Sequence, residues 1–190
     1  MIVFNNAPKD WQAISTRKVY SNYFLQLYED ILKIKGTNKT YIRGIRKDYS
    51  TIVPFVSKEE ILMIKSYRHL VDSVEIEVPS GYIDVGETAI EAANRELKEE
   101  TGYVSSKMIP IGVYTLDYTM FNQIGNLFIA YNLVKEKEQS LGLMEKIDIE
   151  IMNIKEIEKL LSNGKILNSA SIVALYRAIA YHKNNYVKKL

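Results

Sequence analysis

The chain of 190 residues contains no cysteine, and it has only two histidines, one tryptophan and four prolines. Without cysteine it can form no disulfide, no thiol nucleophile and no cysteine-ligated metal site, a composition compatible with the cytoplasmic location that we expect. Two histidines also argue against a histidine-rich metal site. No run of 18 apolar residues is present and residues 1–10 lack the pattern of a secretion signal, so we expect no membrane partner.

Net charge is also small, because 25 Lys and Arg face 23 Asp and Glu, which gives +2. This total favours no nucleic-acid partner. It hides an uneven distribution, however. Residues 75–100 hold eight acidic and two basic residues, a net charge of −6, whereas the other 164 residues carry +8. The concentration of carboxylates in this one segment therefore calls for a physical explanation.

Runs of β-type residues predict strands at residues 23–27, 31–35, 40–46, 51–56, 61–67, 74–78, 111–116, 126–134 and 147–151. Helical patterns predict helices at residues 88–101, 155–161 and 169–182. Strands and helices are mixed without a strict βαβ rhythm. We therefore expect an α+β fold, a layered sandwich with a mixed sheet and a β-rich N-terminal region.

The helix from Thr88 carries the clustered carboxylates. Thr88 and Glu91 have the spacing of a capping box. At 100° per residue, Glu96, Glu99 and Glu100 fall on one face beside an apolar stripe. Like charges four residues apart destabilise a helix, so this face needs a compensating cation, and oxygen ligands suit Mg²⁺ or Mn²⁺ better than zinc. The alternative is a solvated acidic face.

The residues around this helix form a longer pattern. Its fixed positions are Gly81, Glu87, Arg95, Glu96, Glu99, Glu100 and Gly102. With this spacing the segment resembles the Nudix box, G-x5-E-x7-R-E-U-x-E-E-x-G-U, with Tyr103 where an aliphatic residue is commoner. The resemblance implies a Nudix-type α/β/α sandwich as a hydrolase domain at residues 41–190, and a β-rich extension at residues 1–40.

The resemblance also implies roles for the residues of the box. The expected metal ligands are the Ser80 carbonyl and the carboxylates of Glu96, Glu99 and Glu100. With Mg²⁺, or Mn²⁺ in its place, Glu99 and Glu100 would be catalytic in the attack of water on a phosphorus of a diphosphate.

Four further positions of the motif are expected to be structural. We expect Arg95 to pair with Glu87 and so to hold the loop against the helix. Gly81 would permit the sharp exit from the preceding strand, and Gly102 would supply the left-handed stop of the helix.

Two segments outside the box are similar to those of ADP-ribose pyrophosphatases. Residues 75–87 resemble their E-x-P-A-G-x-I-D-x-G-E lead-in, and residues 64–69 resemble their V-x-Q-Y-R segment. This resemblance implies that Arg68 and Glu77 bind the substrate and that the extension is exchanged across a homodimer. Aromatic candidates for stacking on adenine, with core packing as the alternative, are Tyr20, Tyr23, Phe24 and Tyr28.

Residues 115–123 depart from the relatives' Y-P-S-P-G-x-S-D-E segment, because the prolines are absent and the acidic end is Asn122-Gln123. The leading interpretation is hydrolysis of ADP-ribose or a related nucleoside diphosphate sugar. The alternatives are another Nudix substrate, such as a dinucleoside polyphosphate, a GDP-sugar or an NTP, or a non-catalytic ligand sensor. Glu145 is expected to act as a general base or to be a solvated loop charge. His69 beside Arg68 is expected to be a surface residue or a polar core residue.

Overall fold

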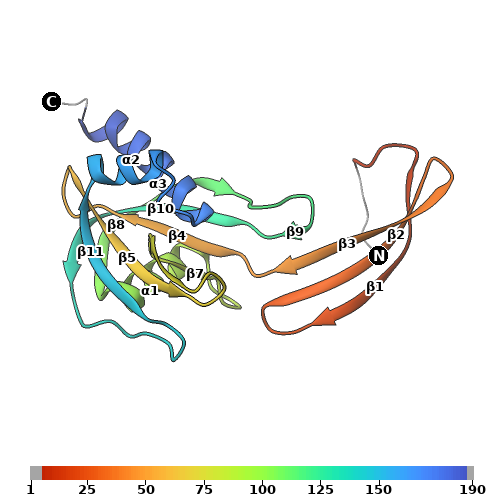
Figure 1. Ribbon diagram of the computed structural model, residues 1–190, viewed down its shortest axis with the longest axis horizontal. Helices are drawn as coiled ribbons and strands as arrows, with labels where there is room; N and C mark the ends of the chain where they lie inside the picture. The colour runs from red at the N-terminus through yellow and green to blue at the C-terminus, as the bar shows by residue number, and fades with distance from the viewer. Residues whose placement is uncertain (1–5, 188–190) are drawn as a thin grey trace. The chain divides into compact units, whose positions relative to one another are not determined.

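The structure is a computed structural model that describes the backbone of residues 6–187 and the side chains of residues 6–185 (Figure 1). The chain divides into two compact units. Unit 1 comprises Met1–Lys47 and Thr115–Ile124, and unit 2 comprises Asp48–Tyr114 and Gly125–Leu190.

Unit 1 is a four-stranded sheet in the order β1 (Trp11–Ser21), β2 (Leu25–Ile34), β3 (Thr37–Arg46) and β9 (Phe121–Asn122). The first three strands are antiparallel, and β9 runs parallel to β3. Gly44 permits this last pairing, since a Cβ there would lie 2.5 Å from the Phe121 ring. The segment that departs from the pattern of the relatives is thus part of the N-terminal sheet.

One prediction for unit 1 was wrong, and one of its long strands was missed. The strands expected at residues 23–27 and 31–35 are one continuous strand, β2, because its central residues pair across both neighbours rather than turning. Strand β1 was not predicted. Its side chains are almost all exposed, so no apolar face repeats along it, and pairing with β2 rather than its own pattern makes it a strand.

Unit 2 contains two sheets. The first has the order β7 (Ser80–Tyr82), β4 (Tyr49–Pro54), β10 (Gly125–Lys135), β8 (Tyr103–Tyr114). The second has the order β11 (Ile147–Asn153), β5 (Glu60–Arg68), β6 (Ser73–Glu77). Strand β10 is parallel to β4 and antiparallel to β8, which confirms the expected mixed sheet.

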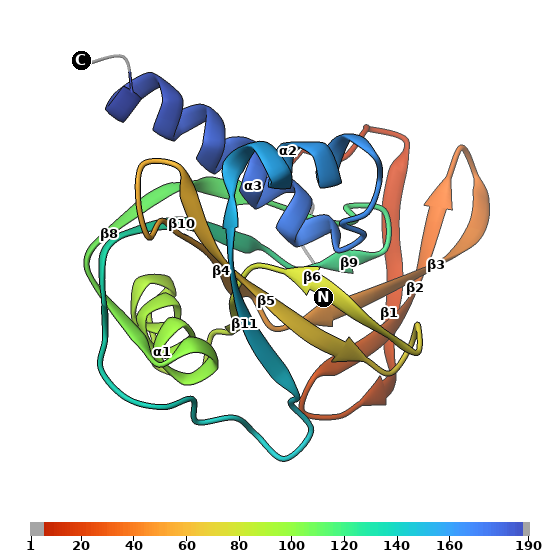
Figure 2. The same ribbon diagram turned by 60° about the vertical axis from the view of Figure 1, so that its left-hand side comes forward.

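Helices cover both faces of the first sheet. They are α1 (Ala89–Thr101), α2 (Ile154–Ser162) and α3 (Ser169–His182), and the short π-helix η1 (Lys183–Val187) follows α3. Figure 2 shows α1 on one side of β4 and β10, with α2 and α3 on the other. Successive side chains of β4 point to opposite faces of the sheet. Ile52 belongs to the core cluster with Leu97 of α1, and Val53 belongs to the cluster with Leu175 of α3. The α/β/α sandwich is therefore confirmed.

Most helix and strand boundaries lie within two residues of those predicted, but β8 does not. It begins at Tyr103, directly after the helix, whereas residues 111–116 were expected. The polar residues Ser105, Ser106 and Lys107 hide this half of the strand from an apolar pattern, although it pairs with β10 throughout. Among the described residues, no helix is long and apolar enough to cross a membrane.

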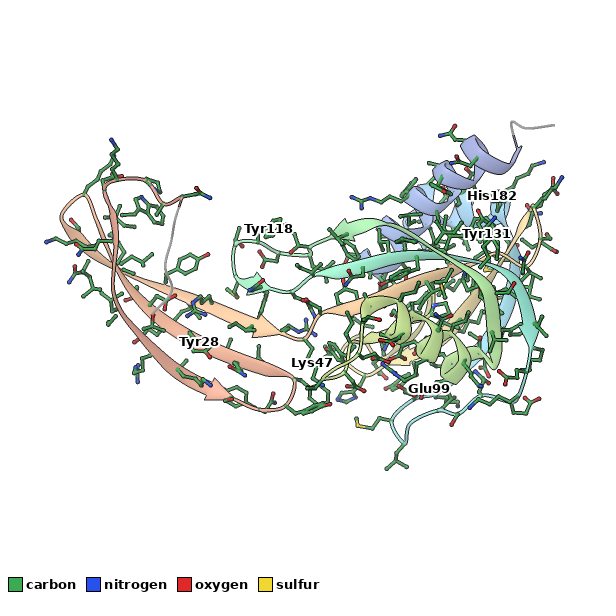
Figure 3. The ribbon with its side chains drawn as sticks, turned by 180° about the vertical axis from the view of Figure 1, so that it is seen from behind. Tyr28, Lys47, Glu99, Tyr118, Tyr131 and His182 are labelled. Carbon is green, nitrogen blue, oxygen red and sulfur yellow. The ribbon has the colours of Figure 1, made fainter. Side chains whose placement is uncertain are left out.

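His182 lies at the end of α3, buried to 2% exposure. Its Nε2–H donates to the Lys58 carbonyl at 3.0 Å, so in the neutral ring Nδ1 accepts from the Tyr131 hydroxyl at 2.9 Å. The ring also stacks on Phe55 at 4.3 Å between centroids, and Figure 3 labels His182 and Tyr131. Burial lowers the pKa of His182 below its ordinary value near 6.5.

We expect this histidine to make unfolding pH-dependent. A His pKa lower in the folded than in the unfolded chain contributes stability that is complete above the unfolded pKa of about 6.5 and is lost as the pH falls below it. His182→Gln can keep both hydrogen bonds without titrating. Urea unfolding at pH 8 and pH 5.5 should show a larger loss of unfolding free energy in the wild type than in this variant. Equal losses would contradict the assignment.

Candidate active site

The acidic helix α1 begins and ends as its sequence predicts. Thr88 is the N-cap, and it forms a complete capping box with Glu91. At the other end Gly102 has a φ of 74° and its N–H donates to the Lys98 carbonyl. A Cβ on Gly102 would also lie 2.1 Å from the Lys137 carbonyl oxygen, so glycine is required there both by backbone conformation and by space.

Arg95 is the centre of the ion pairs on this helix. Its Nε and Nη2 donate to the two carboxylate oxygens of Glu87 at 2.8 and 2.9 Å, which is the predicted pair. Nη2 also donates to the Tyr82 carbonyl at 2.8 Å, and Nη1 donates to Glu96 at 2.7 Å and to Glu99 at 3.1 Å. The pKa of the guanidinium is raised by these partners, Glu87 first, and that of Glu87 is lowered by Arg95. One cation thus holds the loop and two expected metal ligands.

Glu96 and Glu100 converge on Ser80 and Gly81 at the start of β7. Gly81 pairs with Ser50 of β4, so it lies within a strand and not at the sharp strand exit that was expected. The Ser80 N–H donates to Glu100 Oε2 at 2.9 Å. The Glu96 carboxylate lies against Gly81, because a Cβ there would be 1.9 Å from Oε1 and 2.0 Å from Cδ. The structure therefore brings together both ends of the predicted box, and Gly81 makes the space for a carboxylate.

Burial sets the electrostatics of these two carboxylates. Glu100 is only 5% exposed, and burial raises its pKa well above the ordinary range, helped by the charge of Glu96 and opposed by the Ser80 N–H. The pKa of Glu96 is also raised, mainly by burial, and Arg95 opposes that shift. Two neighbouring buried carboxylates that resist ionisation are stabilised in their charged form by a cation.

The oxygen-only donor set of α1 fits a hard divalent ion such as Mg²⁺ or Mn²⁺. Within residues 6–185, no three acidic or histidine side chains already stand close enough together to hold a metal ion. Glu96 and Glu99 instead share Arg95, and Figure 3 labels Glu99 on the helix. Arg95 contacts Glu96 Oε1 and Glu99 Oε2, one oxygen of each carboxylate.

Arg68 and Glu77, both predicted to bind substrate, bind each other. Arg68 Nε and Nη2 donate to the two oxygens of Glu77 at 2.7 and 2.5 Å. Glu77 is buried to 1% exposure, whereas the side chain of Arg68 is 44% exposed. The pKa of Arg68 is raised, first by Glu77 and further by the charges of Glu100 and Glu145. Arg68 is therefore the accessible partner and lies within electrostatic reach of the acidic helix.

Glu145 is exposed in the loop before β11. Its carboxylate accepts the Gly142 N–H at 2.6 Å, and its own N–H donates to the Gly142 carbonyl at 3.0 Å. Its charge contributes to the raised pKa of both Glu96 and Glu100. The loop therefore holds Glu145 within electrostatic reach of the acidic helix. This position is compatible with a general base and with a solvated loop charge. His69 is exposed in the turn after β5.

The four aromatic candidates for base stacking all lie in unit 1. Tyr28 lies under the Arg43 guanidinium, at 4.3 Å. The other three, Tyr20, Tyr23 and Phe24, are at least half exposed. Their exposure argues against core packing, and the Tyr23 ring contacts Phe24 edge-on at 5.0 Å and the Lys47 ammonium at 3.6 Å.

Sequence reasoning missed Asn168. It precedes α3, and its Nδ2 donates to Glu77 Oε2 at 3.2 Å. An asparagine before a helical pattern indicates an N-cap, which Asn168 is. Nothing in the pattern indicates contact with a residue 91 positions earlier.

Fold and site together define a class: an α/β/α sandwich whose acidic loop-helix-loop fits divalent metal ions. The NUDIX domain family model matches residues 46–168, and the chain belongs to this family. It is therefore a hydrolase of pyrophosphate bonds, in a family that generally uses divalent metal ions.

Two relatives and one solved structure match most of the chain at low sequence identity. The ADP-ribose pyrophosphatase of Bacillus subtilis (strain 168) is 23% identical over 166 residues, 86% of this chain and 90% of that protein. The methanol dehydrogenase activator of Bacillus methanolicus is 25% identical over 167 residues, with the same coverage. The crystal structure of an ADP compounds hydrolase superposes with a TM-score of 0.84, over 95% of this chain and 98% of that one, at 22% identity.

We expect Gly81→Ala to weaken metal binding. The added methyl group would displace the Glu96 carboxylate, so the affinity for Mn²⁺, measured by titration calorimetry, should fall about tenfold or more. Gly36→Ala is the control, because Gly36 has a φ of 82° and open space around it. That variant should lose about 1 kcal/mol of stability and keep its Mn²⁺ affinity. Equal Mn²⁺ affinity in Gly81→Ala and the wild type would contradict the assigned role.

Proposed function

We propose that this Nudix protein hydrolyses the diphosphate of ADP-ribose or a related nucleoside diphosphate sugar, giving a nucleoside monophosphate and a sugar phosphate. The observation that carries the proposal is the convergence of Glu96 and Glu100 on Ser80 and Gly81. The cation of Arg68 lies within electrostatic reach of Glu100. The similarity to a protein named ADP-ribose pyrophosphatase supports this substrate class.

In this proposal, the acidic residues of the box bind the metal and the basic residue Arg95 positions them. Glu96, Glu99, Glu100 and the Ser80 carbonyl are the proposed ligands of Mg²⁺, or of Mn²⁺ in its place. When bound, the metal would neutralise the diphosphate and lower the pKa of the attacking water. Arg95 keeps Glu96 and Glu99 on the side of the loop, and Gly81 leaves room for the Glu96 carboxylate.

Arg68 and Glu145 act on the substrate from outside the helix in this proposal. Arg68 is bound to Glu77 by Nε and Nη2, and neither bond uses Nη1, which we assign to a substrate phosphate oxygen. Glu145 is the candidate general base, because it is exposed and its charge acts on both Glu96 and Glu100. Glu77 then serves the substrate through Arg68.

Unit 1 supports homodimerisation as part of the proposal. Its exposed large apolar side chains are Trp11, Ile14, Val19, Tyr20, Tyr23, Phe24, Tyr41 and Ile42, together with Leu116, Tyr118, Met120 and Ile124. The concentration of exposed large apolar side chains in one small unit favours its burial against another subunit. Light scattering should give twice the mass of the 21.9 kDa chain, and a monomer would contradict this expectation.

The function is tested by a substrate panel. Purified protein with Mg²⁺ or Mn²⁺ is offered ADP-ribose, other nucleoside diphosphate sugars, dinucleoside polyphosphates and NTPs, and the products are separated by chromatography. We expect AMP and ribose phosphate from ADP-ribose, and no turnover after chelation of the metal. Turnover of another nucleotide alone would overturn the substrate, whereas binding without turnover would favour a ligand sensor.

Two isosteric substitutions assign the roles in the same assay. Glu100→Gln removes a buried carboxylate charge and should lower turnover about 100-fold or more. Glu145→Gln should lower kcat about 100-fold if Glu145 is the general base. Unchanged turnover in Glu145→Gln would remove this residue from the mechanism and identify it as a solvated charge.

A further inference from the structure

Glu77 is held by three N–H donors from two distant parts of the chain. Two come from Arg68 on β5, and the third is the side-chain amide of Asn168 at 3.2 Å, which lies just before α3. Because Glu77 is almost fully buried, every one of its hydrogen bonds replaces a bond to water that burial removed. The amide is thus one of the groups that orient this carboxylate.

The amide of Asn168 can face Glu77 in only one orientation. Its Oδ1 accepts the Ser171 N–H at 2.9 Å, which is the N-cap bond of α3, so the other side of the amide presents Nδ2 to Glu77. A flipped amide would lose the cap and turn an oxygen toward a carboxylate. The capping bond therefore directs the donor.

The first turn of α3 is tied to the same strand end a second time. The Ser171 hydroxyl oxygen accepts the N–H of Val78, the residue after Glu77, at 3.1 Å, and both groups are buried. Further along, Leu175 and Ala178 of α3 lie in the main core with no exposed surface. The helix thus provides a rigid support for residues 77 and 78, which directly precede β7 with Ser80 and Gly81.

We propose that Asn168 is a positioning residue for substrate binding, which acts through Glu77 on Arg68. The N-cap bond orients the amide, the amide fixes Glu77 Oε2, and Glu77 fixes the planar guanidinium of Arg68 through two parallel bonds. Asn168 is neutral, so it adds a donor to Glu77 without competing with Arg68 for charge. The proposal rests on the proposed function in one respect, the role of Arg68 as a phosphate contact.

The test uses two asparagine N-caps in one protein. Asn168 caps α3 and Asn153 caps α2, but only Asn168 reaches Glu77. Serine caps a helix about as well as asparagine and is too short to reach Glu77. We expect Asn168→Ser to raise KM for the substrate about tenfold with a smaller change in kcat, and Asn153→Ser to leave KM unchanged.

Asn168→Asp gives a second, sharper comparison. Aspartate also keeps the cap, but it places a carboxylate oxygen where Nδ2 donated to the Glu77 carboxylate. KM should therefore rise more in Asn168→Asp than in Asn168→Ser. Thermal unfolding of both variants reports whether the cap is kept, and a rise in KM that follows the loss of stability rather than the loss of the donor would overturn the proposal.

Coupling to Arg68 is tested in an Arg68→Lys background, which keeps the positive charge beside Glu77 but loses the planar two-bond geometry. If Asn168 acts through Arg68, Asn168→Ser should change KM much less in this background than in the wild type. An equal change in both backgrounds would show that Asn168 acts by another route and would overturn the proposal.

A readout without turnover separates this proposal from the proposed function. The ¹⁵Nε–H signal of Arg68 in an NMR spectrum should shift and broaden in Asn168→Ser and remain unchanged in Asn153→Ser. If no diphosphate is hydrolysed by the wild type, the proposed function fails, and the NMR signal still tests the link from Asn168 to Arg68. An unchanged Arg68 signal in Asn168→Ser would overturn the link.

Discussion

The acidic helix depends on the Arg95 guanidinium, which donates to three carboxylates and one backbone carbonyl. Glu87 and the Tyr82 carbonyl belong to the loop, and Glu96 and Glu99 belong to the helix, so this one cation both folds the loop and offsets repulsion on α1. Glu100 lies outside its contacts and depends on the Ser80 N–H instead. Arg95 therefore holds Glu87, Glu96 and Glu99 close together, whereas burial raises the pKa of both Glu96 and Glu100.

A second arginine pairs with a second glutamate for a different purpose. The Arg68–Glu77 pair joins two strands of the second sheet, and Glu77 also receives the amide that caps α3. A buried charge pair stabilises a fold only weakly, because desolvation offsets most of the attraction. Its value here is geometric, since it holds an accessible guanidinium in one orientation beside the acidic helix.

Sequence reasoning succeeded where the interactions are local. The capping box, the left-handed stop at Gly102 and the Arg95–Glu87 pair all join residues within a few turns of one helix and its loop. It failed for β1 and for the first half of β8, which become strands through partners far along the chain. For residues 115–123 the sequence showed only a departure from a pattern, whereas the structure places them in unit 1, where Phe121–Asn122 form β9 of the N-terminal sheet.

The sequence by itself placed Glu96, Glu99 and Glu100 on one face of a helix through helix geometry. The resemblance of the surrounding segment to the Nudix box, rather than that geometry alone, indicated the class of chemistry. The sequence also predicted the left-handed stop at Gly102, whereas the structure shows that Gly81 lies within β7 and provides space for the Glu96 carboxylate rather than a sharp exit from a strand. Only the tertiary structure decided that Glu77 binds Arg68, and that Asn168 donates to Glu77 from 91 residues away. The reason is that α3 packs against the core beside Glu77, which brings Asn168 close to it. Because Glu77 is buried, its carboxylate is stabilised by hydrogen bonds from nearby donors instead of water.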